Sequence, residues 1–115
     1  MRKVEYSQIV RRKIKVLKAR LTGEFGSKVS SKALKQITEA ARGLGEFAEK
    51  GTSVSAMYGI DCEYRYLYIN HNYLFYRIEE KKIIIVEMFD EREDFMYQLF
   101  GISTTTQETI DYWNE

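Results

Sequence analysis

The sequence predicts a single α+β domain in which an N-terminal strand and a helix hairpin pack on an antiparallel sheet. Two observations support this fold class. Two amphipathic helical patterns occupy the first half of the chain, and three strand-like runs follow one another between Tyr64 and Phe89. A length of 115 residues is that of one domain.

The first half begins with a short strand and a helix. We expect the strand over Lys3 to Tyr6 and the helix after Ser7, a good N-cap residue. We expect Thr22-Gly23 and Gly26 to break the helix. Its apolar residues recur at i, i+4, i+7 and i+11, the spacing of one buried stripe: Val10, Ile14, Leu17 and Leu21.

A second helix completes the predicted hairpin. We expect it to begin near Ser30 or Ser31 and to end at Gly43 or Gly45. Its buried side is predicted to contain Ala33, Leu34, Ile37, Ala41 and Leu44.

The pattern weakens from Glu46 to Ile60, where we expect a loop anchored by Val54, Met57 and Tyr58. Three strands rich in aromatic and β-branched residues are then predicted, separated by turns at Asn70-His71-Asn72 and at Glu79 to Lys82. The strands cover Glu63 to Ile69, Tyr73 to Glu79 and Ile83 to Phe89.

The third strand is apolar on both faces apart from Glu87, so it is expected inside the sheet with cover on each side. A helix hairpin covers one face only. We therefore expect the C-terminal part of the chain to cover most of the other face, through Phe95, Met96, Leu99 and Phe100.

Charge is divided unevenly along the chain, although the net charge is +1. Residues 1–50 carry 13 Lys/Arg against 5 Asp/Glu, a balance of +8, and residues 51–115 carry 5 against 12, a balance of −7. The first half therefore offers either a cationic surface for a polyanion or an acidic partner, or a solvated helix face that serves solubility alone. The sequence leaves both alternatives open.

Composition also narrows the class of protein. No apolar run reaches the roughly 20 residues that span a bilayer, and the N-terminus lacks a signal-peptide core. One cysteine, Cys62, and one histidine, His71, predict neither an internal disulfide nor a multi-histidine metal site. We expect a cytoplasmic protein with no membrane partner and no cofactor.

Three segments carry a resemblance to a known family: YLFYRIE at residues 73–79, the apolar run at 83–88, and REDFMYQLFG at 92–101. With the element order β-α-α-β-β-β-α, they resemble the RelE/ParE toxin superfamily over Arg2 to Gly101. The resemblance implies a toxin domain at residues 1–102. Residues 103–115 would then form a C-terminal extension.

The resemblance implies the toxin of a type II toxin–antitoxin pair, held inactive by a cognate antitoxin. RelE-like members act at the ribosome and cleave mRNA, and we favour this activity because basic helices suit an RNA environment. ParE-like members inhibit DNA gyrase without nuclease chemistry. A non-toxic interaction module is the third alternative. Only the first would be an enzyme, a metal-independent endoribonuclease.

For RNA cleavage the resemblance implies catalytic roles for Arg77, Arg92 and Tyr97. RNA contacts are expected from basic side chains of the first helix and the first predicted strand of the sheet: Arg11, Arg12, Lys15, Lys18 and Arg65. We expect Arg77 and Arg92 to face one shared hollow. The structural alternatives are an ion pair with a nearby carboxylate for Arg77, an ion pair or a helix-start position for Arg92, and a core position for Tyr97.

The sequence departs from the nuclease pattern at two places. The predicted strand Tyr73 to Glu79 begins Tyr73-Leu74, whereas the RelE-like pattern has an arginine after the tyrosine, and here the arginine comes later, at Arg77. Asp90 and Glu91 stand where a basic cluster is usual, and carboxylates repel RNA phosphate at close range.

Overall fold

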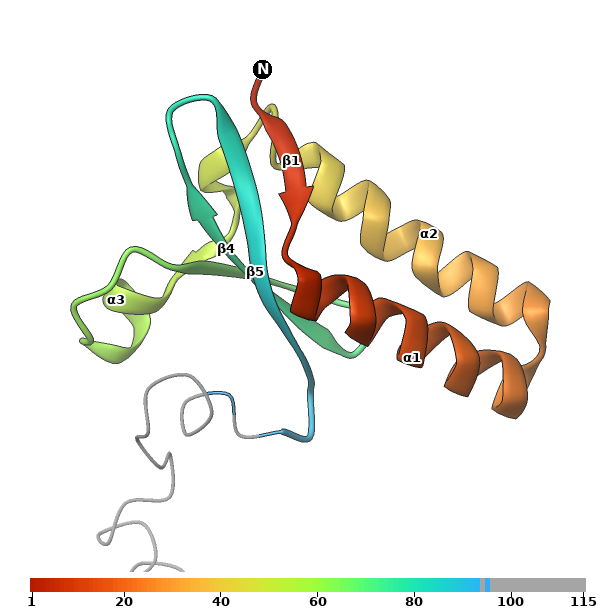
Figure 1. Cartoon of the computed structure of the whole chain (residues 1–115). Helices are drawn as coiled ribbons and strands as arrows, with labels where there is room; N and C mark the ends of the chain where they lie inside the picture. Colours follow the sequence, from red (N-terminus) through yellow and green to blue (C-terminus); the bar gives the residue numbers. More distant parts are fainter. Residues whose placement is uncertain (94, 96–115) are drawn as a thin grey trace, which may run out of the picture.

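The computed structural model describes residues 1–93 and Phe95, and it contains a helix hairpin packed against a five-stranded sheet (Figure 1). Met96, Tyr97, Leu99 and Phe100 and the predicted extension at 103–115 lie outside the described residues. In chain order the elements are β1 (Lys3–Tyr6), α1 (Gln8–Phe25), α2 (Ser27–Gly43), the 3₁₀-helix η1 (Ala48–Lys50), β2 (Thr52–Ser53), α3 (Val54–Tyr58), β3 (Arg65–Ile69), β4 (Asn72–Ile78) and β5 (Lys82–Asp90).

The sheet has the strand order β1-β5-β4-β3-β2, which confirms the fold class and places β5 in the interior. Strands β2 to β5 are antiparallel, whereas β1 runs parallel to β5, with Val4 opposite Ile83 and Tyr6 opposite Ile85. The sheet is therefore mixed rather than antiparallel throughout. The apolar strand β5 needs a hydrogen-bonded neighbour on each edge, and β1 supplies the second one.

Helix α1 begins as predicted, because the Ser7 Oγ accepts a hydrogen bond from the Val10 N–H at 3.2 Å. It continues through Gly23 and ends only at Gly26, whose φ of 89° is in the left-handed region that favours glycine. Helix α2 begins at Ser27, so the predicted start near Ser30 is wrong. Ser30 is buried and donates its Oγ–H to the Lys18 carbonyl at 3.2 Å, which makes it a helix–helix contact and not a cap.

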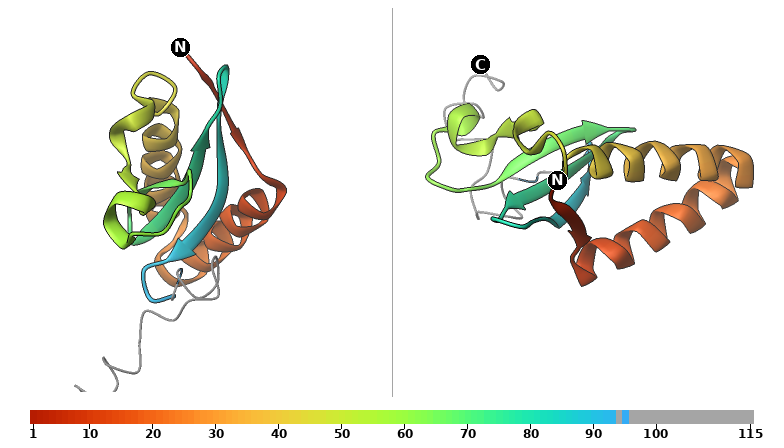
Figure 2. Two further views of the ribbon diagram at one scale, coloured as in Figure 1. Left: turned by 90° about the vertical axis from the view of Figure 1, so that its left-hand side faces the viewer. Right: turned by 90° about the horizontal axis from the view of Figure 1, so that it is seen from above.

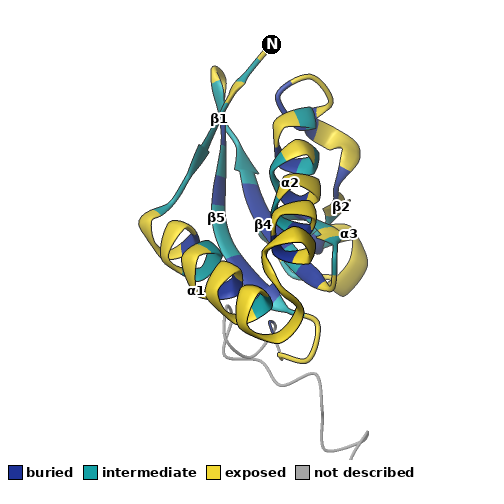
Figure 3. Ribbon diagram, turned by 90° about the vertical axis from the view of Figure 1, so that its right-hand side faces the viewer, coloured by how far each residue is buried: buried dark blue, intermediate teal, exposed yellow. Residues whose placement is uncertain are grey.

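Each face of the sheet has its own core, as the sequence predicts. The face toward the helices buries Val10, Leu17, Ile37, Ala41 and Leu44 against side chains of β4 and β5 (Figure 3). On the far face Phe95 packs against Tyr66 and Phe75, so the predicted cover from the C-terminal part is confirmed for Phe95.

The register of strand β5 shifts within its pairing with β4, and the shift changes which residues face each core. Phe75 lies opposite Glu87 but Tyr76 lies opposite Ile85, which leaves Val86 as the extra residue of a β-bulge. Before the bulge Ile83 and Ile85 face the helices, and after it Met88 does.

The segment from Glu46 to Ile60, predicted as a loop, contains η1, β2 and α3. Its organiser is the buried Tyr76, whose hydroxyl donates to the Ala48 carbonyl at 2.7 Å and accepts from the Gly51 N–H at 2.9 Å. Val54 is buried as predicted, but Met57 is 61% exposed, so the prediction that it anchors this segment is wrong. None of the described helices has the length and apolar character needed to cross a membrane.

Candidate functional site

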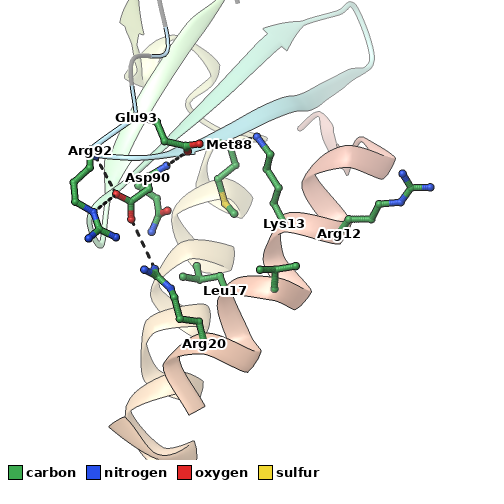
Figure 4. A pocket seen from close by; sticks show the side chains of 10 residues that line it. Arg12, Lys13, Leu17, Arg20, Met88, Asp90, Arg92 and Glu93 are labelled. Carbon is green, nitrogen blue, oxygen red and sulfur yellow. Dashed lines mark hydrogen bonds and ion pairs between the residues drawn. The ribbon is translucent and has the colours of Figure 1, made fainter. Parts of the chain in front are cut away.

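A groove of about 470 Å³ lies between α1 and the end of β5 (Figure 4). The groove is lined by one side of α1, by the start of β4, and by the end of β5 with the residues that follow it. Its apolar floor is surrounded by charged side chains. The lining residues are Arg12, Lys13, Val16, Leu17, Arg20, Asn72, Met88, Asp90, Arg92 and Glu93.

Arg92 stands at the edge of this groove and is held by Asp90. The Arg92 backbone N–H and Nε–H both donate to Asp90 Oδ1, each at 2.9 Å, while Arg20 Nη2 lies 3.7 Å from the other oxygen, Oδ2. Hydrogen bonding from Arg92, helped by the nearby charges of both arginines, lowers the pKa of Asp90. Asp90 is therefore an anion between two cations, and Arg92 is already engaged.

Lys13 closes the inner side of the groove. Its ammonium group lies 2.8 Å from Glu87 Oε1, donates to the Met88 carbonyl at 2.8 Å, and stands 4.4 Å from the centre of the Phe89 ring. These contacts satisfy the charge of Glu87, the one ionisable side chain in the middle of the apolar strand. Lys13 thus connects α1 to the bulged part of β5.

Arg77 lies at the other end of the sheet and does not line the groove. It sits opposite Ile84, whereas Asn72, opposite Asp90, marks the groove end of β4. Five residues of strand separate these positions, about 17 Å. Arg77 pairs with Glu79 at 3.2 Å and Glu63 at 3.8 Å. The two arginines predicted to share a hollow are thus not brought together.

The other predicted residues fall into three groups. Arg11, Arg12, Lys15 and Lys18 are exposed on α1, and of these only Arg12 lines the groove. In Figure 4 Arg12 points away from the Asp90 cluster. Arg65 donates to the Gly51 carbonyl at 2.9 Å, so it supports the η1–β2 segment. Tyr97 lies outside the described residues.

One cluster was missed at the sequence level. Glu91 accepts hydrogen bonds from the Tyr68 hydroxyl and lies 3.0 Å from His71 Nδ1, which gathers three titratable groups at the β3–β4 turn. Hydrogen bonding from Tyr68, then from His71, lowers the pKa of Glu91. The β4–β5 register brings this cluster together, since Asn72 lies opposite Asp90 and His71 therefore lies beside Glu91. A correct prediction of that register would have identified the cluster.

The family model described as the ParE toxin of the type II toxin–antitoxin system parDE matches residues 4–95. The chain belongs to the ParE toxin family. No curated protein matches it.

A solved structure of the chromosomal ParDE toxin–antitoxin system from P. aeruginosa matches the ParE fold of this chain with a TM-score of 0.65. The identity is 16%, and the match covers 78% of this chain and 96% of that chain. At this identity the likeness supports the fold alone. Family membership makes the protein the toxin of a type II ParDE pair, with a cognate antitoxin as its partner.

Proposed function

We propose that this ParE toxin inhibits growth by binding DNA gyrase and does not cleave RNA itself. The observation that supports this proposal is that Arg77 lies about 17 Å along β4 from Asn72, the residue opposite Asp90, whereas Arg92 follows Asp90 and lines the groove. It reverses the preference for mRNA cleavage that the basic helices suggest at the sequence level.

RNA cleavage by 2′-hydroxyl attack needs a base, a cation for the charged phosphorane and an acid, all within reach of one phosphate. Arg77 and Arg92 are too far apart to share a phosphate. Each is also already paired with a carboxylate, Arg77 with Glu79 and Arg92 with Asp90. The groove further contains Asp90 and Glu93, which repel phosphate.

The groove is better suited to a protein segment than to a phosphate. Leu17 and Met88 are buried in its floor, and Val16 is 68% exposed beside them. Arginines surround this apolar floor, a combination that protein interfaces use for anchoring. A toxin that acts by binding needs such a surface and no assembled catalytic centre.

Ribosome-dependent mRNA cleavage is the second candidate, favoured by the exposed cations Arg11, Arg12, Lys15 and Lys18 on α1. The two candidates differ in what happens after the toxin is induced without its antitoxin. The proposal predicts growth arrest with intact transcripts, a DNA damage response, and inhibition of gyrase supercoiling by the purified toxin. Fragmented transcripts with normal supercoiling would reject it in favour of RNA cleavage, and undisturbed growth would favour a binding module.

A further inference from the structure

We propose that the outer surface of the α1–α2 hairpin binds the phosphate backbone of duplex DNA. This inference goes beyond gyrase binding and does not depend on it. The observation that carries it is two regular rows of exposed cations, of which all but Lys35 have no ion-pair partner among the described residues.

The hairpin is strongly basic. Residues 8–43 contain ten Lys/Arg and two Asp/Glu, Glu24 and Glu39. Three of the cations are used internally, because Lys13 pairs with Glu87, Arg20 with Asp90 and Lys35 with Glu39. Seven exposed cations of the hairpin have no ion pair with a described residue: Arg11, Arg12, Lys15, Lys18, Lys28, Lys32 and, at the sheet end of α2, Arg42.

The spacing of the cations is regular on both helices. On α1 they stand at 11, 15 and 18, and on α2 at 28, 32 and 35, so each row follows i, i+4 and i+7 along one helix face. At 1.5 Å per residue, neighbours in a row are about 6 Å and 4.5 Å apart along the axis. Phosphates of one DNA strand recur about every 3.4 Å, so each cation in a row can reach a different phosphate.

The surface is also accessible. The ends of α1 and α2 that meet at Gly26 extend beyond the sheet, so no strand covers them (Figure 2). Lys28 and Lys32 follow Gly26 within two turns of α2, and both are exposed, as is Lys18 on α1.

Duplex DNA fits this surface better than single-stranded RNA. Binding of single strands relies on aromatic side chains that stack on bases, and the hairpin contains one aromatic residue, Phe25. Cations without a stacking platform recognise the regular backbone of a duplex. We therefore assign the hairpin to sequence-independent contact with DNA.

The test is fluorescence anisotropy of the purified toxin with a labelled duplex of about 30 base pairs at several salt concentrations. The test variant Lys15→Glu/Lys32→Glu changes the middle of each row. The control Lys50→Glu/Lys81→Glu makes the same change in net charge at two exposed lysines outside the hairpin. Circular dichroism checks that both variants fold.

We expect the wild type to bind the duplex with an affinity that falls steeply as salt rises. The hairpin variant should bind at least about tenfold more weakly, and the slope of log affinity against log salt should be shallower by about 2. The control should retain most of the affinity.

Three results would overturn the inference. They are no duplex binding by the wild type at low salt, equal weakening in both variants, and tighter binding of a single-stranded RNA of the same length. Because no gyrase is present in the assay, each of these results would leave the gyrase proposal standing.

Discussion

Lys13 on α1 and Glu87 on β5 form an ion pair of 2.8 Å at the point where the central strand changes register. The bulge leaves a carboxylate in the middle of an apolar strand, and the lysine neutralises it from the helix layer. The side chains of Lys13 and Glu87 are 35% and 18% exposed, so water solvates the Glu87 carboxylate only in part and the lysine supplies the rest of its stabilisation.

Lys13→Ala is therefore expected to lower the free energy of unfolding by about 1 kcal/mol, because Glu87 loses its partner while remaining half-buried. Urea denaturation measures the change. Lys15→Ala, at an exposed position on the same helix, is the control and should have little effect. Adding Glu87→Gln to Lys13→Ala should restore part of the loss, and a fully additive loss would contradict the coupling.

Alanine substitution should have opposite effects at two glycines. At Gly51 a Cβ would lie 2.5 Å from the Tyr76 hydroxyl and 2.7 Å from the Tyr66 carbonyl, so Gly51→Ala should cost about 1–3 kcal/mol. At Gly23, inside α1, nothing lies within 4 Å, and Gly23→Ala should stabilise by about 0.5–1 kcal/mol. Thermal unfolding of the two variants checks both signs. The same sign at both positions would be inconsistent with this packing.

Asp90 should titrate below its ordinary pKa of 3.8 in the folded protein. A lowered folded-state pKa means that the interaction stabilises the fold above the ordinary pKa and is lost as pH falls through the lowered value. The Arg92→Ala variant should move the Asp90 pKa back upward and reduce the loss of stability below about pH 4. NMR titration of the side-chain carboxyl measures this. An unchanged Asp90 pKa would show that Arg92 is not the main cause.

Val16→Asp should reduce gyrase inhibition at least about tenfold if the groove beside α1 is the docking surface, since a carboxylate would replace an exposed apolar contact. The variant should stay folded, because Val16 is 68% exposed. Ile9→Asp is the matched control. Ile9 is 50% exposed two turns earlier on the same helix and does not line the groove. Equal inhibition by both variants would remove the groove from the proposed function.

Local periodicity in the sequence determined the helices and the three long strands. The stripe from Val10 to Leu21, the Ser7 cap and the Asn70-His71 turn act on neighbours a few residues away, so their patterns are visible in the chain itself. The positive φ values of Asn70 and His71, 51° and 64°, follow from the same local chemistry.

Contacts between distant segments decided the rest. The sequence alone suggests a helix N-cap near Ser30, but in the fold the Ser30 hydroxyl donates to the Lys18 carbonyl of the neighbouring helix. The segment around Gly51 resembles a loop in sequence, but Tyr76, 25 residues away, binds it through a hydrogen bond. The positions of the predicted site residues depend most on such contacts between distant segments. The sequence predicts that Arg77 and Arg92 face one hollow, but Arg77 lies opposite Ile84, whereas Arg92 follows Asp90 at the other end of the β4–β5 pair. The pairing of the two strands decides this placement, and spacing along the chain does not show it.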